Sequence, residues 1–212
     1  MLMIWGRNTS SNVQIVTWAV AEMGLEHRRI DWGGAFGGNN DPEYRQMNPN
    51  GLIPTIRDGD VVVWESAAIL RYLGARYGGT AFWPKDPAKR APLDMWAEWI
   101  KTTFVPPLTN QVFWQLVRTR EGERDQAMID DGVASLKLAA ACLDARLGAG
   151  PYLNGAQLCF ADIMIGHILY RYFTIDFERA DAPNLEDYYR RLQERRAYRE
   201  HVMVSYESLR VR

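Results

Sequence analysis

The sequence has few of the residues that build metal centres and disulfide frameworks. It contains two cysteines, Cys142 and Cys159, and three scattered histidines among 212 residues. Their spacing matches no zinc-binding pattern, and one pair of cysteines makes no disulfide framework. The sequence therefore predicts a metal-free protein of a reducing compartment, which we take to be the cytoplasm.

Long apolar runs and an excess of charge of one sign are also absent. The 25 Lys and Arg residues nearly balance the 26 Asp and Glu residues, so no electrostatic footprint for nucleic acid or an anionic membrane exists. No apolar run approaches membrane-spanning length. The first five residues read as an apolar strand and lack the features of a cleavable signal. We therefore predict neither nucleic acid nor a membrane as a partner.

Strand and helix signals divide the chain into two parts. The first part, residues 1–79, carries a β-α-β-α-β-β-α pattern that predicts a thioredoxin-like domain. Residues 80–91 have the composition of a linker. Residues 92–212 carry almost no strand signal, so we expect an all-helical domain. Its predicted helices cover residues 92–103 and 110–117, with a kink at Pro106-Pro107 between them. Further helices are predicted over 125–147, over 160–173 as an apolar central helix, and over 183–196, followed by a mostly helical tail.

The most informative stretch is residues 48–73, NPNGLIPTIRDGDVVVWESAAILRYL. A turn leads to Pro54, which heads a short strand over Thr55–Arg57. Asp58-Gly59 predicts a two-residue hairpin turn, because glycine accepts the positive φ that such turns need. A β-branched strand then returns, and a helix with apolar residues at helical spacing follows it.

Pro54 and the Glu65-Ser66 pair that opens this helix each allow two interpretations. A cis bond after Ile53 would turn the Ile53 backbone outward, where an extended peptide-like ligand could pair with it, whereas a trans proline only opens the strand. Ser66 lies where a helix exposes unpaired N–H groups, a site for a carboxylate, and Glu65 could take an ammonium. Alternatively, Ser66 only caps the helix, and the negative charge of Glu65 only interacts favourably with the positive end of the helix dipole.

In a thioredoxin-like domain the loop after the first strand carries the reactive group. Here that loop holds Ser10, Ser11 and Asn12 and has no cysteine. Thiol–disulfide exchange by the protein itself is therefore excluded at this position. A serine hydroxyl can instead donate a hydrogen bond to a bound thiolate, or it can cap the following helix.

The motif Asn-Pro-x-Gly-x-Ile-Pro-Thr, followed by Asp-Gly and Glu-Ser-x-x-Ile-x-x-Tyr-Leu, resembles the glutathione-binding half of cytosolic glutathione transferases of the bacterial, serine type. The order of a thioredoxin-like and a helical domain is similar too. The resemblance implies that Pro54 is cis, that the Ile53 backbone pairs with the cysteinyl part of glutathione, and that Glu65 and Ser66 hold its γ-glutamyl group. It also implies a homodimer and a role in detoxification.

The resemblance further assigns the catalytic hydroxyl to Ser10, with Ser11 as the alternative and Asn12 as a second donor. A free thiol has a pKa near ~8.5, and one charge-assisted hydrogen bond of about 1.5–3 kcal/mol would lower it by one to two units. The thiolate would then attack an apolar electrophile. For this electrophile we expect a site lined by aromatic residues, chosen from Trp5, Trp32, Phe104, Phe113 and Trp114.

Two positions depart from the family pattern. Many relatives have Lys or Gln, in contact with the glycyl carboxylate, where this chain has Leu52, so we expect that contact from Asn50 or the loop over residues 33–40. Cys159 replaces the Ser or Thr that caps the helix before Asp162. A thiol is a poor acceptor, so we expect only Asp162 to bond back to the cap amide, and we assign Cys159 no nucleophilic role.

Two alternatives to conjugation stay open. One is a glutathione-dependent isomerase or dehalogenase, although the Ser-Ser-Cys-Ser signature of maleylacetoacetate isomerases is replaced here by Ser10-Ser11-Asn12-Val13. The other is a non-catalytic binding module. We rank it last because the chain keeps both the serine and the Glu-Ser pair.

Overall fold

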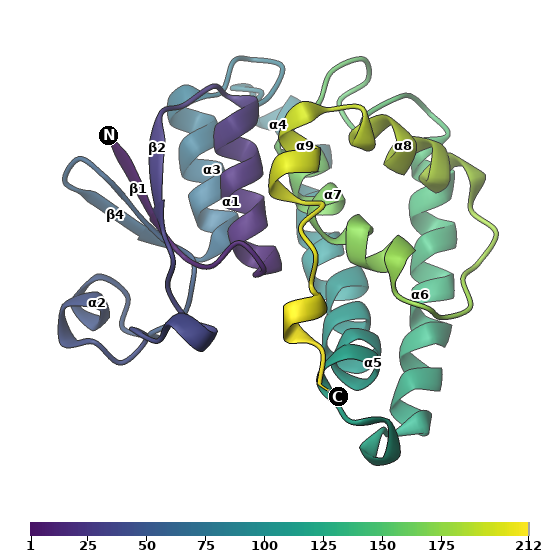
Figure 1. The fold of residues 1–212 in the computed structure, drawn as a ribbon. Helices are drawn as coiled ribbons and strands as arrows, with labels where there is room; N and C mark the ends of the chain where they lie inside the picture. Colours follow the sequence, from purple (N-terminus) through teal and green to yellow (C-terminus); the bar gives the residue numbers. More distant parts are fainter. Residues whose placement is uncertain (212) are drawn as a thin grey trace.

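The computed structural model describes residues 1–211. Within them one mixed sheet has the strand order β2-β1-β3-β4. β1 (Leu2–Trp5) pairs in parallel with β2 (His27–Ile30) and antiparallel with β3 (Thr55–Asp58), and β3 pairs antiparallel with β4 (Val61–Trp64). Figure 1 shows this sheet at one side of the molecule, with α1 (Ser11–Glu22) and α3 (Ser66–Tyr77) between it and the helical part.

Helix α1 is buried on two faces, and it thereby joins the two parts of the chain. Val16 and Val20 pack with Ile4 and Ile56 of the sheet. On its other face Trp18 belongs to the large core of the helical domain. Nearly all of α1 is therefore shielded from water, which explains why its sequence is apolar beyond a single stripe.

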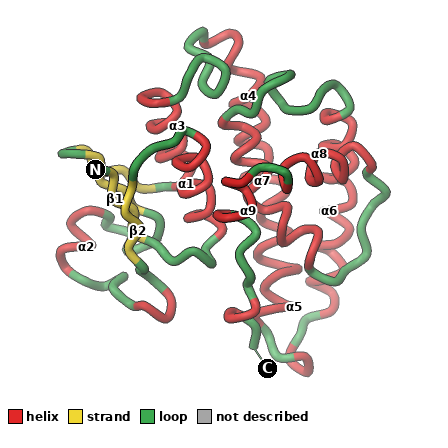
Figure 2. The backbone as a smooth tube through the Cα atoms, turned by 45° about the horizontal axis from the view of Figure 1, so that its top comes forward, coloured by secondary structure: helices red, strands yellow, loops and turns green. Residues whose placement is uncertain are grey.

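The remaining elements are helical. The short helix α2 (Pro42–Met47) starts at Asp41, whose carboxylate accepts from Glu43 N and Tyr44 N. The other α-helices are α4 (Pro87–Trp99), α5 (Trp114–Arg118), α6 (Gln126–Leu147), α7 (Phe160–Thr174), α8 (Pro183–Gln193) and α9 (Arg196–His201). Figure 2 shows α4 to α9 gathered on one side of the strands, with α2 lying apart from them. No helix in residues 1–211 is both long and apolar enough to cross a membrane.

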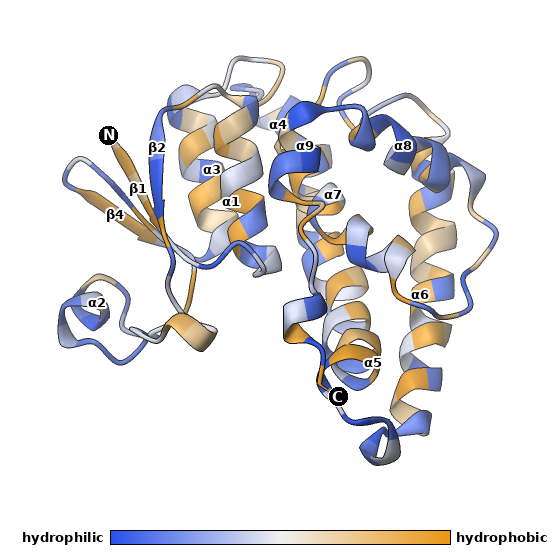
Figure 3. Ribbon diagram, viewed as in Figure 1, coloured by the Kyte–Doolittle hydropathy of each residue, from blue (hydrophilic) through white to orange (hydrophobic). Residues whose placement is uncertain are grey.

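The predicted central helix is confirmed as α7, which is buried along almost its whole length. Figure 3 shows that α8 and α9, by contrast, are mostly hydrophilic. Asp162 fixes the start of α7: its carboxylate accepts from Cys159 N at 2.8 Å, Leu153 N at 3.0 Å and the Tyr188 hydroxyl at 2.9 Å. Burial raises the pKa of the Cys159 thiol, consistent with a structural role for this residue.

Three predicted boundaries are wrong. Asp58 pairs with Val61, so the hairpin turn is Gly59-Asp60 and not Asp58-Gly59. Gly59, with φ 61°, thus takes the first central position of the turn. The first helix of the second domain starts at Pro87 instead of 92, because Asp86 caps it by accepting from Ala88 N at 2.9 Å. The last long helix ends at Gln193, and α9 is the final α-helix before residue 212.

The two helical stretches predicted on either side of Pro106-Pro107 belong to one continuous helical segment. The chain stays helical from Pro87 to Arg118, with π-helical segments at Ile100–Phe104 and Pro107–Phe113. A π-helical turn changes the hydrogen-bond pattern locally, so it accommodates residues that lack an N–H without ending the helix.

Candidate functional site

Two cavities open beside the N-terminus of α1. The smaller one, of about 70 Å³, is lined by residues from three segments: Asn12, Asn48, Leu52, Ile53, Pro54, Glu65 and Ser66. Apart from Asn48, all of these were predicted site residues. The structure thus brings most of the predicted glutathione contacts together. Asn50 does not line this cavity; it is exposed, and its side chain donates to Asn48 Oδ1.

The small cavity lies between the N-termini of two helices. Ser66, the first residue of α3, donates from Oγ to Asn12 Oδ1 of α1 over 3.3 Å. Glu65 occupies the N-cap position of α3 without a side-chain cap bond, so the interpretation of Ser66 as a plain cap is wrong. Unpaired N–H groups at such termini favour an anion. Lys101 approaches the Glu65 carboxylate at 3.9 Å.

The rim of the small cavity is rigidly built. The Ile53–Pro54 bond is cis, as the resemblance implied. The Leu52 carbonyl accepts from the Tyr44 hydroxyl at 2.6 Å and from Asn48 Nδ2 at 2.8 Å. Within residues 1–211 the N–H and C=O of Ile53 have no backbone partner, so they can pair with a ligand. Burial raises the pKa of Tyr44, which keeps its hydroxyl a donor.

Ser10 and Ser11 face the larger cavity, of about 280 Å³. Ser10 is the N-cap residue of α1, yet its side chain makes no cap hydrogen bond. The capping interpretation therefore fails for Ser10, and its hydroxyl stays available. The loop before it is fixed from the helical domain, because Arg171 donates to Thr9 O at 2.7 Å.

The larger cavity differs from the predicted aromatic site. Phe113 and Trp114 line it as expected, but Trp5, Trp32 and Phe104 do not. Phe104 is fully buried in the helical core. The Trp5 ring lies beneath the Arg57 guanidinium, and the Trp32 ring packs against Tyr44 with centroids 5.2 Å apart. These three aromatics support the fold around the site.

The sequence analysis did not single out several polar residues that line the two cavities, nor Lys101, which lies beside Glu65. The lining residues are Asn48, Arg7, Thr9, Thr109, Arg118 and Arg171. Three of these residues carried a usable signal, since Arg7 and Thr9 belong to the loop that holds the reactive group and Asn48 opens the stretch 48–73. The others come from helices whose orientation no local pattern supplies. In the described part of the chain no cluster of three or more His, Cys, Asp or Glu side chains could hold a metal ion.

Comparison with known proteins decides the family. The model of the glutathione S-transferase N-terminal domain matches residues 9–76, and that of the C-terminal domain matches residues 126–191. Glutathione S-transferase GstB of Escherichia coli is 39% identical over 209 residues, which cover 96% of this chain and 99% of that protein. The chain belongs to the glutathione S-transferase family. This confirms the family predicted from residues 48–73.

Solved structures of glutathione transferases agree with the assignment of the chain to this family. A theta class glutathione S-transferase from Xanthomonas axonopodis pv. citri, with glutathione bound, is 43% identical with a TM-score of 0.90, covering 96% of this chain and 98% of that one. Glutathione transferase BmGSTD1 of Bombyx mori is 25% identical with a TM-score of 0.85, covering 98% and 95%. The predicted fold class, a thioredoxin-like domain followed by a helical domain, is thereby confirmed.

Proposed function

We propose that this glutathione S-transferase binds glutathione at the small cavity and joins its sulfur to an electrophile held in the larger one. The observation that carries the proposal is the position of the α1 N-terminus. Asn12 lines the small cavity while Ser10 and Ser11, immediately before it, line the larger one. A thiol that extends from the first cavity toward the second passes these hydroxyls, which is the geometry that thiol activation requires.

Glutathione binding uses the polar groups of the small cavity. The Glu65 carboxylate takes the α-ammonium of the γ-glutamyl group, and Ser66 with the N-terminus of α3 takes its carboxylate. The free N–H and C=O of Ile53 pair with the cysteinyl backbone. Since Leu52 offers no charge, Asn50 or the loop over residues 33–40 supplies the contact with the glycyl carboxylate.

Thiol activation falls to Ser10, with Ser11 as the alternative donor and Asn12 in support. The Ser10 hydroxyl makes no capping hydrogen bond, so it can donate to the sulfur. This bond and the positive end of α1 together stabilise the thiolate. The sulfur then bonds to the electrophilic carbon and the leaving group departs with its electron pair, while the thiol proton goes to solvent.

Conjugation is favoured over the two alternatives. An isomerase or dehalogenase would use the same bound thiolate, but the family relatives are named as transferases. A binding module would not need a serine whose hydroxyl is free beside a second cavity. We take the electrophile to have an apolar body, because Phe113 and Trp114 line its cavity, and the biological role to be detoxification in the cytoplasm.

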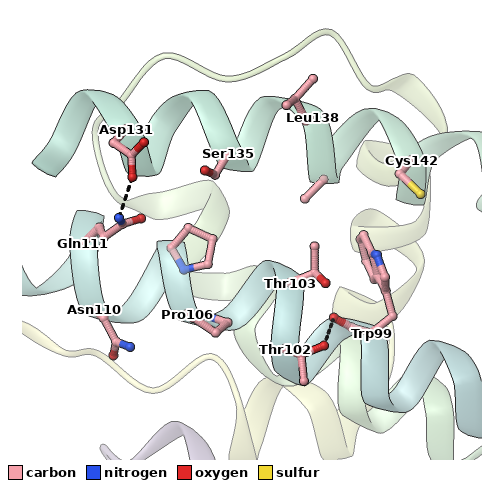
Figure 4. A pocket seen from close by; sticks show the side chains of 12 residues that line it. Trp99, Thr102, Thr103, Pro106, Asn110, Gln111, Asp131, Ser135, Leu138 and Cys142 are labelled. Atoms are coloured by element: carbon pink, nitrogen blue, oxygen red, sulfur yellow. Dashed lines mark hydrogen bonds between the residues drawn. The ribbon is translucent and has the colours of Figure 1, made fainter.

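We also infer a homodimer. A groove of about 650 Å³ runs between α6 and the helical segment after α4, and Figure 4 shows Leu138, Cys142 and Trp99 toward its right-hand end. Leu138 is 77% exposed, a high value for a large apolar side chain. Light scattering should give twice the chain mass for the wild type and for Arg120→Glu, and a single mass for Leu138→Glu. A monomeric wild type would contradict the inference.

Calorimetry with glutathione tests the proposed function. Wild type should bind glutathione, and Ser66→Ala should weaken binding about tenfold, since a hydrogen bond to a charged group contributes about 1.5–3 kcal/mol. Ser205→Ala, at an exposed position that lines neither the two cavities nor the groove, is the matched control and should bind as wild type does. An activated aryl halide then reports conjugation. Absence of glutathione binding in the wild type would contradict the proposal.

A further inference from the structure

Three arginines surround the larger cavity beside Ser10. Arg7 comes from the loop after β1, Arg118 from the end of α5 and Arg171 from α7. Within residues 1–211 none of the three forms a salt bridge with a carboxylate. Nine of the other 17 arginines in this stretch pair with a carboxylate, whereas all three arginines at the cavity lack such a partner, so the cavity gathers unpaired positive charge.

The three charges act on one another. Burial and the nearby Arg118 charge lower the pKa of Arg7, and burial together with Arg7 and Arg118 lowers the pKa of Arg171 to about 10. Arg171 is only 6% exposed. Gathering like charges in a partly desolvated cavity is unfavourable, and an anion that enters the cavity relieves this repulsion.

The aromatic walls lie directly against these charges. The Arg171 guanidinium lies 4.3 Å from the centroid of the Phe113 ring, and that of Arg118 lies 5.4 Å from the Trp114 ring. Arg171 also donates to Thr9 O, so it holds the loop in place as well. Within residues 1–211 the side chains of Arg7 and Arg118 donate no hydrogen bond to a protein group, so their guanidinium N–H donors are free for a planar anion.

We propose that the electrophile of this transferase carries an anionic group, a carboxylate or sulfonate on an apolar body, and that Arg118 and Arg7 bind that group. The proposal rests on the proposed function. In the reaction the glutathione sulfur bonds to the carbon that carries a leaving group such as chloride. Chloride departs with the electron pair of the broken bond, the thiol proton goes to solvent, and the anionic group stays unchanged in contact with the arginines.

A different role for the arginines would be to stabilise the thiolate itself. That role acts on the sulfur, so it would affect charged and neutral electrophiles equally. Discrimination between a carboxylate and its neutral amide therefore separates the two roles. The comparison is best made with stable conjugates, whose binding does not depend on turnover.

The experiment is calorimetry of two conjugates, S-(4-carboxybenzyl)glutathione and S-(4-carbamoylbenzyl)glutathione. Wild type should bind the acid at least about tenfold more tightly than the amide, with a preference that shrinks as salt is added. Arg118→Gln should abolish most of this preference and leave the amide affinity within about threefold of wild type. The matched control is Arg120→Gln, which should change neither affinity. Arg120 is an exposed arginine between α5 and α6; it lies 3.6 Å from the Glu123 carboxylate and does not line the cavity.

The possible results distinguish a failure of the anionic-electrophile proposal from a failure of the proposed transferase function. Equal affinity of wild type for acid and amide would overturn the anionic electrophile and leave the transferase function standing. Equal losses for both conjugates in Arg118→Gln would overturn the assignment to this arginine. Failure of wild type to bind either conjugate or glutathione would contradict the proposed function itself.

Discussion

The indole of Trp18 in α1 packs directly against the backbone of Gly166 in α7. A Cβ on Gly166 would lie 2.5 Å from the Trp18 ring. Trp18 is fully buried, and the Tyr198 ring meets it edge-on with centroids 4.9 Å apart. This contact joins the sheet domain to the helical domain, whose junction forms the larger cavity.

Gly166→Ala should therefore destabilise the protein by about 1–3 kcal/mol, because neither the helix backbone nor the buried indole has room to move. Helix propensity alone would favour alanine by about 1 kcal/mol. Gly122→Ala is the control, since nothing lies within 4 Å of the added Cβ there. Urea unfolding measures both variants, and a Gly166→Ala protein as stable as wild type would contradict the packing.

Glu65 holds a backbone conformation that only glycine adopts readily, with φ 68° and ψ 115°. Glu65→Gly should therefore be more stable than Glu65→Ala by about 1 kcal/mol. Both variants lose the carboxylate, so both should weaken glutathione binding to the same extent. Unfolding curves and calorimetry on the same samples separate the two effects. Equal stability of the two variants would show that the conformation costs nothing.

His167 should make stability depend on pH. It is 2% exposed, its Nδ1 lies 2.7 Å from Met164 O, and burial lowers its pKa to about 4 from the ordinary 6.5. The unfolded chain therefore takes up a proton at a higher pH than the folded protein does. Stability is complete above pH 6.5 and falls as the pH drops toward 4, by about 3 kcal/mol in total.

His167→Asn removes the titrating group and keeps an N–H that can donate to Met164 O. Between pH 6.5 and pH 4 its free energy of unfolding should fall by about 3 kcal/mol less than that of wild type. Denaturant titrations at several pH values measure this difference. An unchanged pH dependence would show that His167 is not the group responsible.

Local sequence patterns predicted those parts of the structure that depend on neighbouring residues. The apolar spacing of α6 and the all-round apolar character of α7 anticipated their place in the core. The continuous stretch 48–73 supplied most of the small cavity. The hairpin register failed by one residue, because an Asp-Gly pair satisfies a turn at either of two positions, and only the pairing of β3 with β4 decides between them.

The larger cavity could not be predicted in the same way. Its residues come from the loop after β1 and the start of α1, from the helical segment that ends at Arg118, from α7, and from Leu209. Their convergence depends on how the two domains pack, which the Trp18–Gly166 contact sets. The sequence predicts only a kink at Pro106-Pro107 and does not show that π-helical turns continue the helix there and keep Phe113, Trp114 and Arg118 on one helical segment.

The pKa of the thiol of bound glutathione tests the central claim most directly. Ultraviolet absorption of the thiolate, followed against pH, should show the bound thiol of wild type titrating one to two units below the free value near ~8.5. Ser10→Ala should raise this pKa by about one unit, and Ser11→Ala should leave it unchanged. A bound thiol that titrates at the free value in wild type would contradict thiol activation, and an effect of Ser11→Ala alone would move the role to Ser11.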